Sequence, residues 1–218
     1  MSWISNTVGR KFLMALSALF LISFLIIHVA INFLSVFSME LYNSASHFMG
    51  TNPLIQFALQ PILIAGVVFH FAIGFALEAK NRASRPLKYA MKNSAANSSW
   101  MSRNMMITGL VILAFLGLHF IDFWVPEMNY KYIENLPADE TRYYGELVHR
   151  MSNPLRVGIY VISFILLALH LMHGFQSSFQ SLGVNNKFTP AIKKFATAFS
   201  FVVPFLFIFI AVYHFLNH

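Results

Sequence analysis

The sequence predicts an all-α membrane protein with five transmembrane helices, because of its composition, its charge-free stretches and the placement of its cationic residues. Of the 218 residues, 57% are hydrophobic, 24 are phenylalanine and only 11% are charged, whereas a soluble domain carries about 25% charged residues. This composition excludes a disordered chain, an ordinary cytosolic enzyme and a nucleic-acid-binding domain. The chain has no cysteine, which also excludes disulfides and thiolate-held iron–sulfur clusters.

Five stretches without Asp, Glu, Lys or Arg are each long enough for a spanning helix, which needs ~20 mainly apolar residues. The first apolar run is 26 or more residues long, against roughly 7–15 in a signal peptide, so we expect it to be retained. The first third of the stretch 41–77 is polar, which favours an interfacial loop or a short helix there. Within one domain, 1–218, we expect helices at 12–36, 55–78, 104–125, 156–179 and 195–216.

Lysine and arginine divide unevenly between the segments that connect these spans. Eleven lie on the side of the N-terminus, and the other four lie on the opposite side with seven of the eight acidic residues. The positive-inside rule therefore places the N-terminus in the cytoplasm and the C-terminus outside. The longest polar segment, 122–156, then becomes an external loop with a short surface helix. The eleven are Arg10, Lys11, Lys80, Arg82, Arg85, Lys88, Lys92, Arg103, Lys187, Lys193 and Lys194.

Histidines are the most informative polar residues of the expected spans. A polar side chain that faces lipid is costly, so these histidines should face the bundle interior and have partners there. A single such residue is more often a packed histidine that bonds a neighbouring helix, but one on each of four helices favours a shared site. The five that lie well inside spans are His28, His70, His119, His170 and His173.

The histidines pair by depth in the membrane. His28 and His119 lie 17 and 16 residues beyond a cytoplasmic cation, or ~24–26 Å at a rise of ~1.5 Å per residue. His70 lies ten residues before one, ~15 Å deep, and His170 reaches a similar depth. Two pairs at two depths are what two bis-histidine haems require, because each low-spin iron takes imidazole nitrogens on both faces of the macrocycle. Four helices would then form a haem-binding bundle.

Glycines near these histidines fit the same hypothesis. A residue without a side chain lets a planar ring lie close to the helix backbone, although tight helix packing in membranes uses glycine equally. We therefore expect haem beside them only in combination with the histidine pairs. They are Gly66, Gly74, Gly117 and Gly174.

Other residues are secondary candidates. His173 lies one turn from His170 and is an alternative ligand or a propionate partner. Gln56 and His47 are polar groups near the expected outer face that a quinone could contact, and His47 follows Glu40 at the mouth of the bundle. We expect the four histidines at span ends to be solvated; they are His47, His149, His214 and His218. As propionate partners we consider Lys11, Arg103, Tyr42 and Tyr160.

Over nearly its full length the chain resembles the single-polypeptide, five-helix di-haem cytochrome b anchor of succinate:quinone oxidoreductases and quinol:fumarate reductases. The family places its fourth ligand four residues before a glycine, which favours His170 over His173. The resemblance implies a proximal haem on His70 and His170 and a distal haem on His28 and His119. It rests on S-x-x-x-G-R-K at Ser5 to Lys11, H-x-x-x-N at His28, H-x-x-x-G at His70, the third-span His119, and H-x-x-H-G-F-Q at His170.

The resemblance implies a membrane-anchor and electron-transfer subunit of respiratory complex II, in the inner membrane of a bacterium. Flavoprotein and iron–sulfur partner subunits would dock on the cytoplasmic face and carry out the succinate or fumarate chemistry of the tricarboxylic acid cycle. Electrons would pass through two b haems to menaquinone or another quinone near the distal haem. Some fumarate reductases of the family have a proton-relay glutamate just before the fourth ligand; Ala168 and Leu169 stand here, so we do not expect that route.

Three alternatives remain open at this point. One is the anchor of a quinol:fumarate reductase or of another b-type cytochrome, such as that of a hydrogenase or formate dehydrogenase. A second is a transporter or proton channel with a histidine relay, which should also show intramembrane acids and broken helices in related halves; the expected spans have no acidic residue in their middle. The third is a passive anchor without a cofactor.

Overall fold

Residues 6–83 and 103–217 are described by the computed structural model, and all regular structure within them is helical. Five helices are long and apolar enough to cross a membrane, as the sequence predicted. The cations Arg85, Lys88 and Lys92, with Ser5 and His218, lie outside the described residues. The five are α1 (Thr7–Leu34); Ile55–Ala83, made of η2 (Ile55–Leu59) and α3 (Gln60–Ala83); Met105–Ile133, made of α6 (Met105–His119), η3 (Phe120–Trp124), α7 (Val125–Met128) and η4 (Asn129–Ile133); α9 (Pro154–Ser181); and α10 (Thr189–Asn217).

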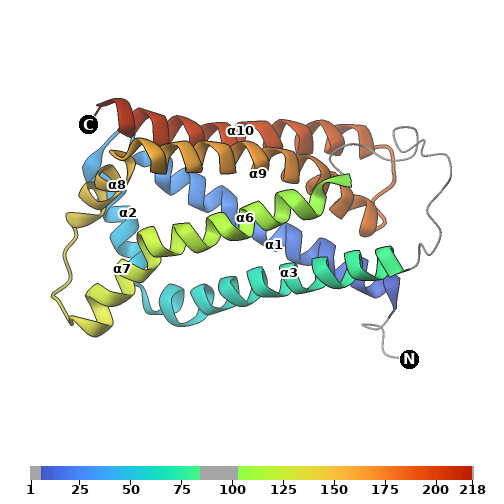
Figure 1. Ribbon diagram of the computed structural model, residues 1–218, viewed down its shortest axis with the longest axis horizontal. Coiled ribbons are helices and arrows are strands. Elements are labelled where there is room, and N and C mark those ends of the chain that lie inside the picture. The colour runs from blue at the N-terminus through green and yellow to red at the C-terminus, as the bar shows by residue number, and fades with distance from the viewer. Residues whose placement is uncertain (1–5, 84–102, 218) are drawn as a thin grey trace.

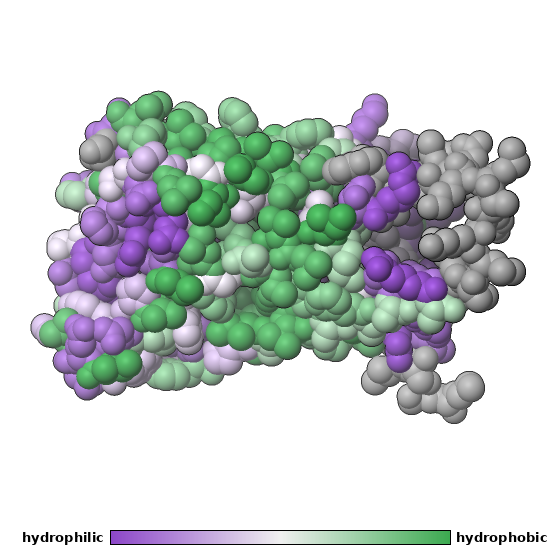
Figure 2. All heavy atoms as spheres, in the orientation of Figure 1, coloured by the Kyte–Doolittle hydropathy of each residue, from purple (hydrophilic) through white to green (hydrophobic). Residues whose placement is uncertain are grey.

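The five helices form one elongated bundle (Figure 1). Figure 2 shows a broad band of apolar residues around its middle and hydrophilic residues gathered toward both ends. This distribution is typical of a chain whose central part lies in hydrocarbon and whose ends lie in water. The helices and the band support a multi-pass membrane protein.

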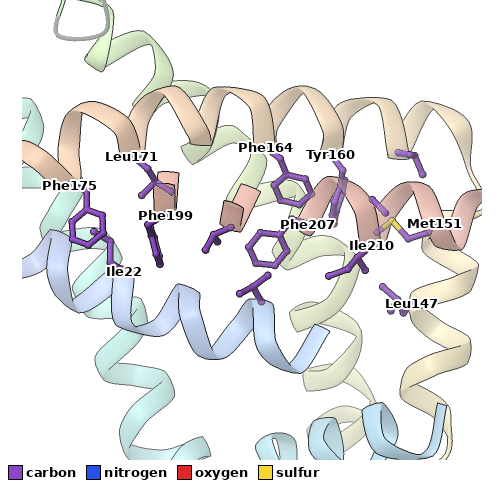
Figure 3. Close-up of a cluster of buried hydrophobic side chains, with 14 of the residues drawn as sticks. Ile22, Leu147, Met151, Tyr160, Phe164, Leu171, Phe175, Phe199, Phe207 and Ile210 are labelled. Atoms are coloured by element: carbon purple, nitrogen blue, oxygen red, sulfur yellow. The ribbon is translucent and has the colours of Figure 1, made fainter. Parts of the chain in front are cut away.

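The tightest packing lies between α9, α10 and α1 (Figure 3). Phe164 of α9 stacks on Phe207 of α10 with 5.1 Å between ring centroids, and Phe175 meets Phe199 edge to face at 5.2 Å. Such aromatic pairs add to the dispersion energy of close packing, which holds helices together where lipid removes the hydrophobic contrast. By contrast, no residue of α3 is buried, and this helix packs mainly on α1.

Polar caps define where the helices begin. The side chain of Asn6 accepts a hydrogen bond from the amide of Gly9 at 2.6 Å, and Asn153 does the same for Arg156 at 3.1 Å. These bonds satisfy backbone amides that have no partner within the helix. Pro154 suits the first position of α9, because its missing amide hydrogen would have no acceptor there.

One end of the bundle is covered by short elements, and we call it the capped end; the other is the N-terminal end. The cover consists of α2 (Met39–Thr51), α8 (Arg142–Met151) and the segment from α7 to η4 (Figure 1). Helix α2 lies in the polar part of 41–77 where a loop or short helix was expected, and α8 provides the short helix expected within 122–156.

The expected end of the third helix, residue 125, was wrong, and so was the beginning of the external loop at residue 122. The helix continues through η3 and η4 to Ile133. Two features explain the difference: apolar residues alternate with the polar ones here, and the Asp122 carboxylate accepts a hydrogen bond from Tyr160. A buried acidic residue with a partner need not end a helix.

Asn43 joins two helices of the cap, α2 and α8. This residue of α2 is buried; its Nδ2 donates to the carbonyl of Thr141 at 3.0 Å, and its Oδ1 accepts the amide of Tyr144 at 2.7 Å. One side chain thus satisfies a carbonyl and an amide at the beginning of α8. Asn43 therefore holds α8 against α2.

Replacing Asn43 should loosen the cap without disturbing the bundle. In Asn43→Ala the two backbone groups lose their partners in a buried site, which costs about 1–3 kcal/mol. Thermal unfolding in detergent should show a lower midpoint, and limited proteolysis should cut the segment 134–141 faster. The control is Ser44→Ala at the next, exposed position; equal effects of both changes would contradict the bridging role.

Candidate functional site

Four of the histidines singled out in the sequence meet in two pairs between the long helices. The ring centroids of His28 (α1) and His119 (α6) are 5.7 Å apart, with an angle of 87° between the ring planes. Those of His70 (α3) and His170 (α9) are 6.5 Å apart at 63°. These are the pairs that the depth argument joined. The His28 pair lies nearer the capped end and the His70 pair nearer the N-terminal end.

Hydroxyl groups orient both rings of the His70 pair. Ser17 Oγ lies 3.0 Å from Nδ1 of His70, and Thr108 Oγ1 lies 3.2 Å from Nδ1 of His170. Each hydroxyl donates its one hydrogen to the carbonyl three residues earlier in its own helix, so it can only accept from the imidazole. Both rings therefore carry their proton on Nδ1, which leaves the Nε2 lone pair free for a metal ion.

The sequence analysis missed these two hydroxyls, although a signal for them exists. Ser17 precedes His28 by eleven residues and Thr108 precedes His119 by eleven, about three helical turns at 3.6 residues per turn. On each helix the hydroxyl and the histidine therefore lie on one face. One helix thus supplies a ligand candidate at one level and an orienting group at the other.

His119 is oriented by a longer chain of polar groups. Its Nδ1 lies 3.4 Å from the hydroxyl of Tyr160, and that hydroxyl donates to Oδ2 of Asp122 at 2.8 Å. Tyr160 and Asp122 are 3% and 2% exposed. We expected no acidic residue in the middle of a span and placed Asp122 at the beginning of an external loop, whereas the structure buries Asp122 within the long third helix. Tyr160, considered as a propionate partner, contacts a ligand candidate.

A cavity of about 260 Å³ opens beside the His28 pair at the capped end. Its lining includes His28 and His119 with Phe24 and Phe123, together with residues of the cap. Apolar walls with a few converging polar groups are typical of cofactor and ligand sites. The polar residues of this lining include Asn32, Tyr42, Ser46, Glu127, Tyr143 and Glu146.

A cluster of ion pairs lies beside this cavity, and its two glutamates, Glu127 and Glu146, belong to the lining. Glu127 pairs with both Lys131 and Arg142, and Arg142 also donates to Glu146 at 2.6 Å. Burial alone would lower the pKa of Arg142, but its hydrogen bonds to the two glutamates outweigh that effect and raise it. Burial raises the pKa of Tyr42 to about 12. Arg142 therefore stays charged and Tyr42 stays neutral at neutral pH.

A second cavity, of about 310 Å³, lies at the outside of the same cap. His47 and Gln56, the secondary candidates from the sequence, both line it, together with Tyr143, which also lines the first cavity. Gln56 bonds the carbonyl of Gly50, whereas the buried Nδ1 of His47 has no hydrogen-bond partner among the described residues. The other ring nitrogen of His47, Nε2, lies 3.6 Å from Oε1 of Glu140, which holds the ring at the lining of this cavity.

The remaining histidines lie in different surroundings. His173 is half-buried one turn beyond His170, and His149 is exposed, as expected. His214 was expected to be solvated, and this was wrong: it is fully buried and its Nε2 lies 2.8 Å from Oγ of Ser35. The packing of α10 against the end of α1 removes it from water.

The glycines allow close packing of side chains from neighbouring helices. A Cβ at Gly66 would lie 2.7 Å from the ring of Phe20, and one at Gly174 would lie 3.2 Å from the end of Met105. At a fifth position, Gly109, a Cβ would lie 3.6 Å from Cε1 of His170. Phe20 and Met105 thus occupy the space beside Gly66 and Gly174, whereas a Cβ at Gly117 would meet no atom within 4 Å.

One known protein is similar to the chain over most of its length. It is the succinate dehydrogenase cytochrome b558 subunit of Bacillus subtilis (strain 168), 24% identical over 188 residues, which cover 83% of this chain and 81% of that protein. No family model matches the sequence, and no solved structure matches it. The similarity supports the family resemblance drawn from the motifs.

Proposed function

We propose that the chain is the membrane-anchor and electron-transfer subunit of a succinate dehydrogenase, respiratory complex II, and that it binds two b haems. One observation carries the proposal: four long helices bring four histidines together as two facing pairs. The similarity to a succinate dehydrogenase cytochrome b558 subunit supports the same assignment. His70 and His170 are then the ligands of the proximal haem, and His28 and His119 those of the distal haem.

The residues present fit such a group. Two imidazoles that bind one metal ion from opposite sides, with bonds of ~2 Å, have ring centres ~6 Å apart; the two pairs measure 6.5 and 5.7 Å. Among residues 6–83 and 103–217, no cluster of three or more His, Cys, Asp or Glu side chains could hold a bare ion. A donor set of two imidazoles suits a metal whose other ligands come from a macrocycle.

The protein's own contribution is geometry and environment. When bound, haem supplies one-electron transfer between a partner's iron–sulfur cluster and quinone. Ser17 and Thr108 hold the imidazoles of His70 and His170 in the tautomer that leaves Nε2 free. Apolar helices exclude water, and the placement of ligands on four helices fixes the spacing of the two sites.

The same proposal places partners on the two faces. The flavoprotein and iron–sulfur subunits would dock at the N-terminal end, which the positive-inside rule puts in the cytoplasm, and the proximal pair is nearer to that end. A quinone, menaquinone by the family pattern, would bind at the capped end. The membrane would be the inner membrane of a bacterium, and the anchor of a quinol:fumarate reductase is the alternative within this family.

The first test is haem content and electron transfer in histidine variants of the purified complex. His70→Ala and His170→Ala should each reduce pyridine-haemochrome haem from two per chain toward one and abolish succinate:quinone activity, because one axial ligand is lost. His28→Ala and His119→Ala should remove the other haem. His173→Ala is the matched control and should retain both haems; retention of both in His170→Ala would contradict the assignment.

The orienting hydroxyls should also be needed for haem binding. Ser17→Ala removes the acceptor of the His70 Nδ1 hydrogen, and outer-shell partners of this kind are worth about 10–100-fold in metal affinity. Haem transfer from the complex to apomyoglobin should therefore be faster by a comparable factor for the proximal haem. Ser23→Ala is the control, since Ser23 also donates to the carbonyl three residues earlier but is exposed. Equal transfer rates for the two variants would contradict this role.

His47 should contribute to quinone binding. His47→Leu removes the imidazole from the lining of the outer cavity, and the loss of one hydrogen bond to a bound quinone should raise the KM for quinone roughly 2–10-fold. Succinate oxidation with a soluble dye, which does not use this site, should remain unchanged. The control is His149→Leu on the exposed face of α8; a KM unchanged by His47→Leu would exclude His47 from the quinone site.

A further inference from the structure

His119 differs from the other oriented histidines in the group that stands behind it. His70 and His170 meet hydroxyls whose hydrogens end on neutral backbone carbonyls. His119 meets Tyr160, whose hydrogen ends on a carboxylate, that of Asp122. Because the Tyr160 hydroxyl donates to Asp122, its oxygen can only accept from His119. The polar chain from His119 therefore ends on an acidic side chain.

The position of Asp122 is costly for a residue with no further role. Its side chain is 0% exposed; Oδ2 accepts the Tyr160 hydroxyl, whereas Oδ1 has no hydrogen-bond partner among residues 6–83 and 103–217 and faces Nη2 of Arg156 at 3.5 Å. Arg156 is 29% exposed in its side chain, so water screens part of the compensation that it gives to the charge of Asp122. An acidic group buried in an apolar bundle with an unsatisfied oxygen lowers stability.

The local helix geometry brings Asp122 to this place. Asp122 lies three residues after His119, within the π-helical turn η3, and Tyr160 lies one helix away on α9. Single π-helical turns within α-helices often occur at functional sites. The wider turn presents His119 and Asp122 to the same tyrosine.

We propose that Asp122, acting through Tyr160, is a positioning residue that keeps the His119 proton on Nδ1 and lowers the reduction potential of the iron bound to His119. The inference rests on the proposed function. A carboxylate behind a ligating histidine increases the basicity of the imidazole. A more basic ligand, and a negative charge nearby, stabilise the ferric state relative to the ferrous state. The His70 and His170 pair has no such charge behind its two hydroxyls.

Arg156 provides a second prediction of opposite sign. Its guanidinium faces the Asp122 carboxylate and offsets part of the negative charge. Removal of the cation leaves more negative charge beside His119, so it should lower the potential further. Asp122→Asn and Arg156→Gln should therefore move one potential in opposite directions, which a general loosening of the helix packing would not do.

The experiment is a potentiometric titration of both haems in the purified complex, followed by visible spectroscopy, with low-temperature EPR of the oxidised protein. Asp122→Asn should move the midpoint potential of the His119 haem to a more positive value and leave that of the other haem unchanged. Arg156→Gln should move it to a more negative value. The ferric low-spin EPR signal of the same haem should change in Asp122→Asn, because the field of its imidazole ligand changes.

Three further variants and a control keep the test decisive. Tyr160→Phe removes one hydroxyl without changing the ring packing and should also raise the potential; it carries the test if Asp122→Asn does not assemble. In the double variant Asp122→Asn with Tyr160→Phe, the shift of the potential should be smaller than the sum of the two single shifts, because both changes act through one network. Asp122→Glu, which retains the charge, should shift the potential less than Asp122→Asn. Glu134→Gln removes an exposed carboxylate just after the end of the same helix and should change neither haem.

The outcomes of this experiment distinguish a failure of this inference from a failure of the proposed function. If the wild-type complex contains two haems and Asp122→Asn and Tyr160→Phe leave both potentials unchanged, the inference is wrong and the proposed function stands. Equal shifts of both haems would also overturn it, since they would indicate a distant electrostatic effect. If the wild-type complex contains no haem, the proposed function fails and the inference fails with it.

Discussion

The structure depends on the need of each buried imidazole for a hydrogen-bond partner in an environment without water. A histidine between transmembrane helices cannot turn to solvent, so the protein must supply an acceptor or lose stability. Ser17 and Thr108 supply it for His70 and His170, and Tyr160 supplies it for His119. In each case the acceptor has already donated its own hydrogen elsewhere. The tautomer of these three rings is thereby decided by the helix that lies opposite.

This constraint also explains how the bundle is assembled. Each orienting hydroxyl lies on a different helix from the histidine that it contacts, so the contacts join α1 to α3 and α6 to α9. Helix α3 has no buried residue and packs mainly on α1, which makes the Ser17 to His70 contact one of few polar contacts that fix its rotation. Helices α9 and α10, with their stacked phenylalanines, form the rigid side against which these contacts are set.

The fold and the pairing of the histidines follow from one-dimensional features of the sequence. Charge-free runs give the helices, and the distance of each histidine from the nearest cation gives its level, because a helix rises by a constant amount per residue. The partners of the histidines do not follow in this way. Whether Tyr160 or another hydroxyl reaches His119 depends on the rotation of α9 about its axis, which packing determines. Asp122 was assigned to a loop because a carboxylate normally ends an apolar span, and only its three-dimensional neighbours show why it does not.

The charges at the capped end and the charge of Asp122 deeper in the bundle have different physical roles. At the capped end, Glu127 and Glu146 pair with Lys131 and Arg142 beside the cavity of the His28 pair, so two acidic and two cationic groups hold the cap together with a formal net charge of zero. Asp122 lies deeper, with one oxygen on Tyr160 and a single cation at 3.5 Å. A charge that is only partly compensated in a medium of low dielectric constant acts over a longer distance than a paired one in water. Asp122 can therefore act on the imidazole of His119 through the hydroxyl of Tyr160, which contacts both side chains.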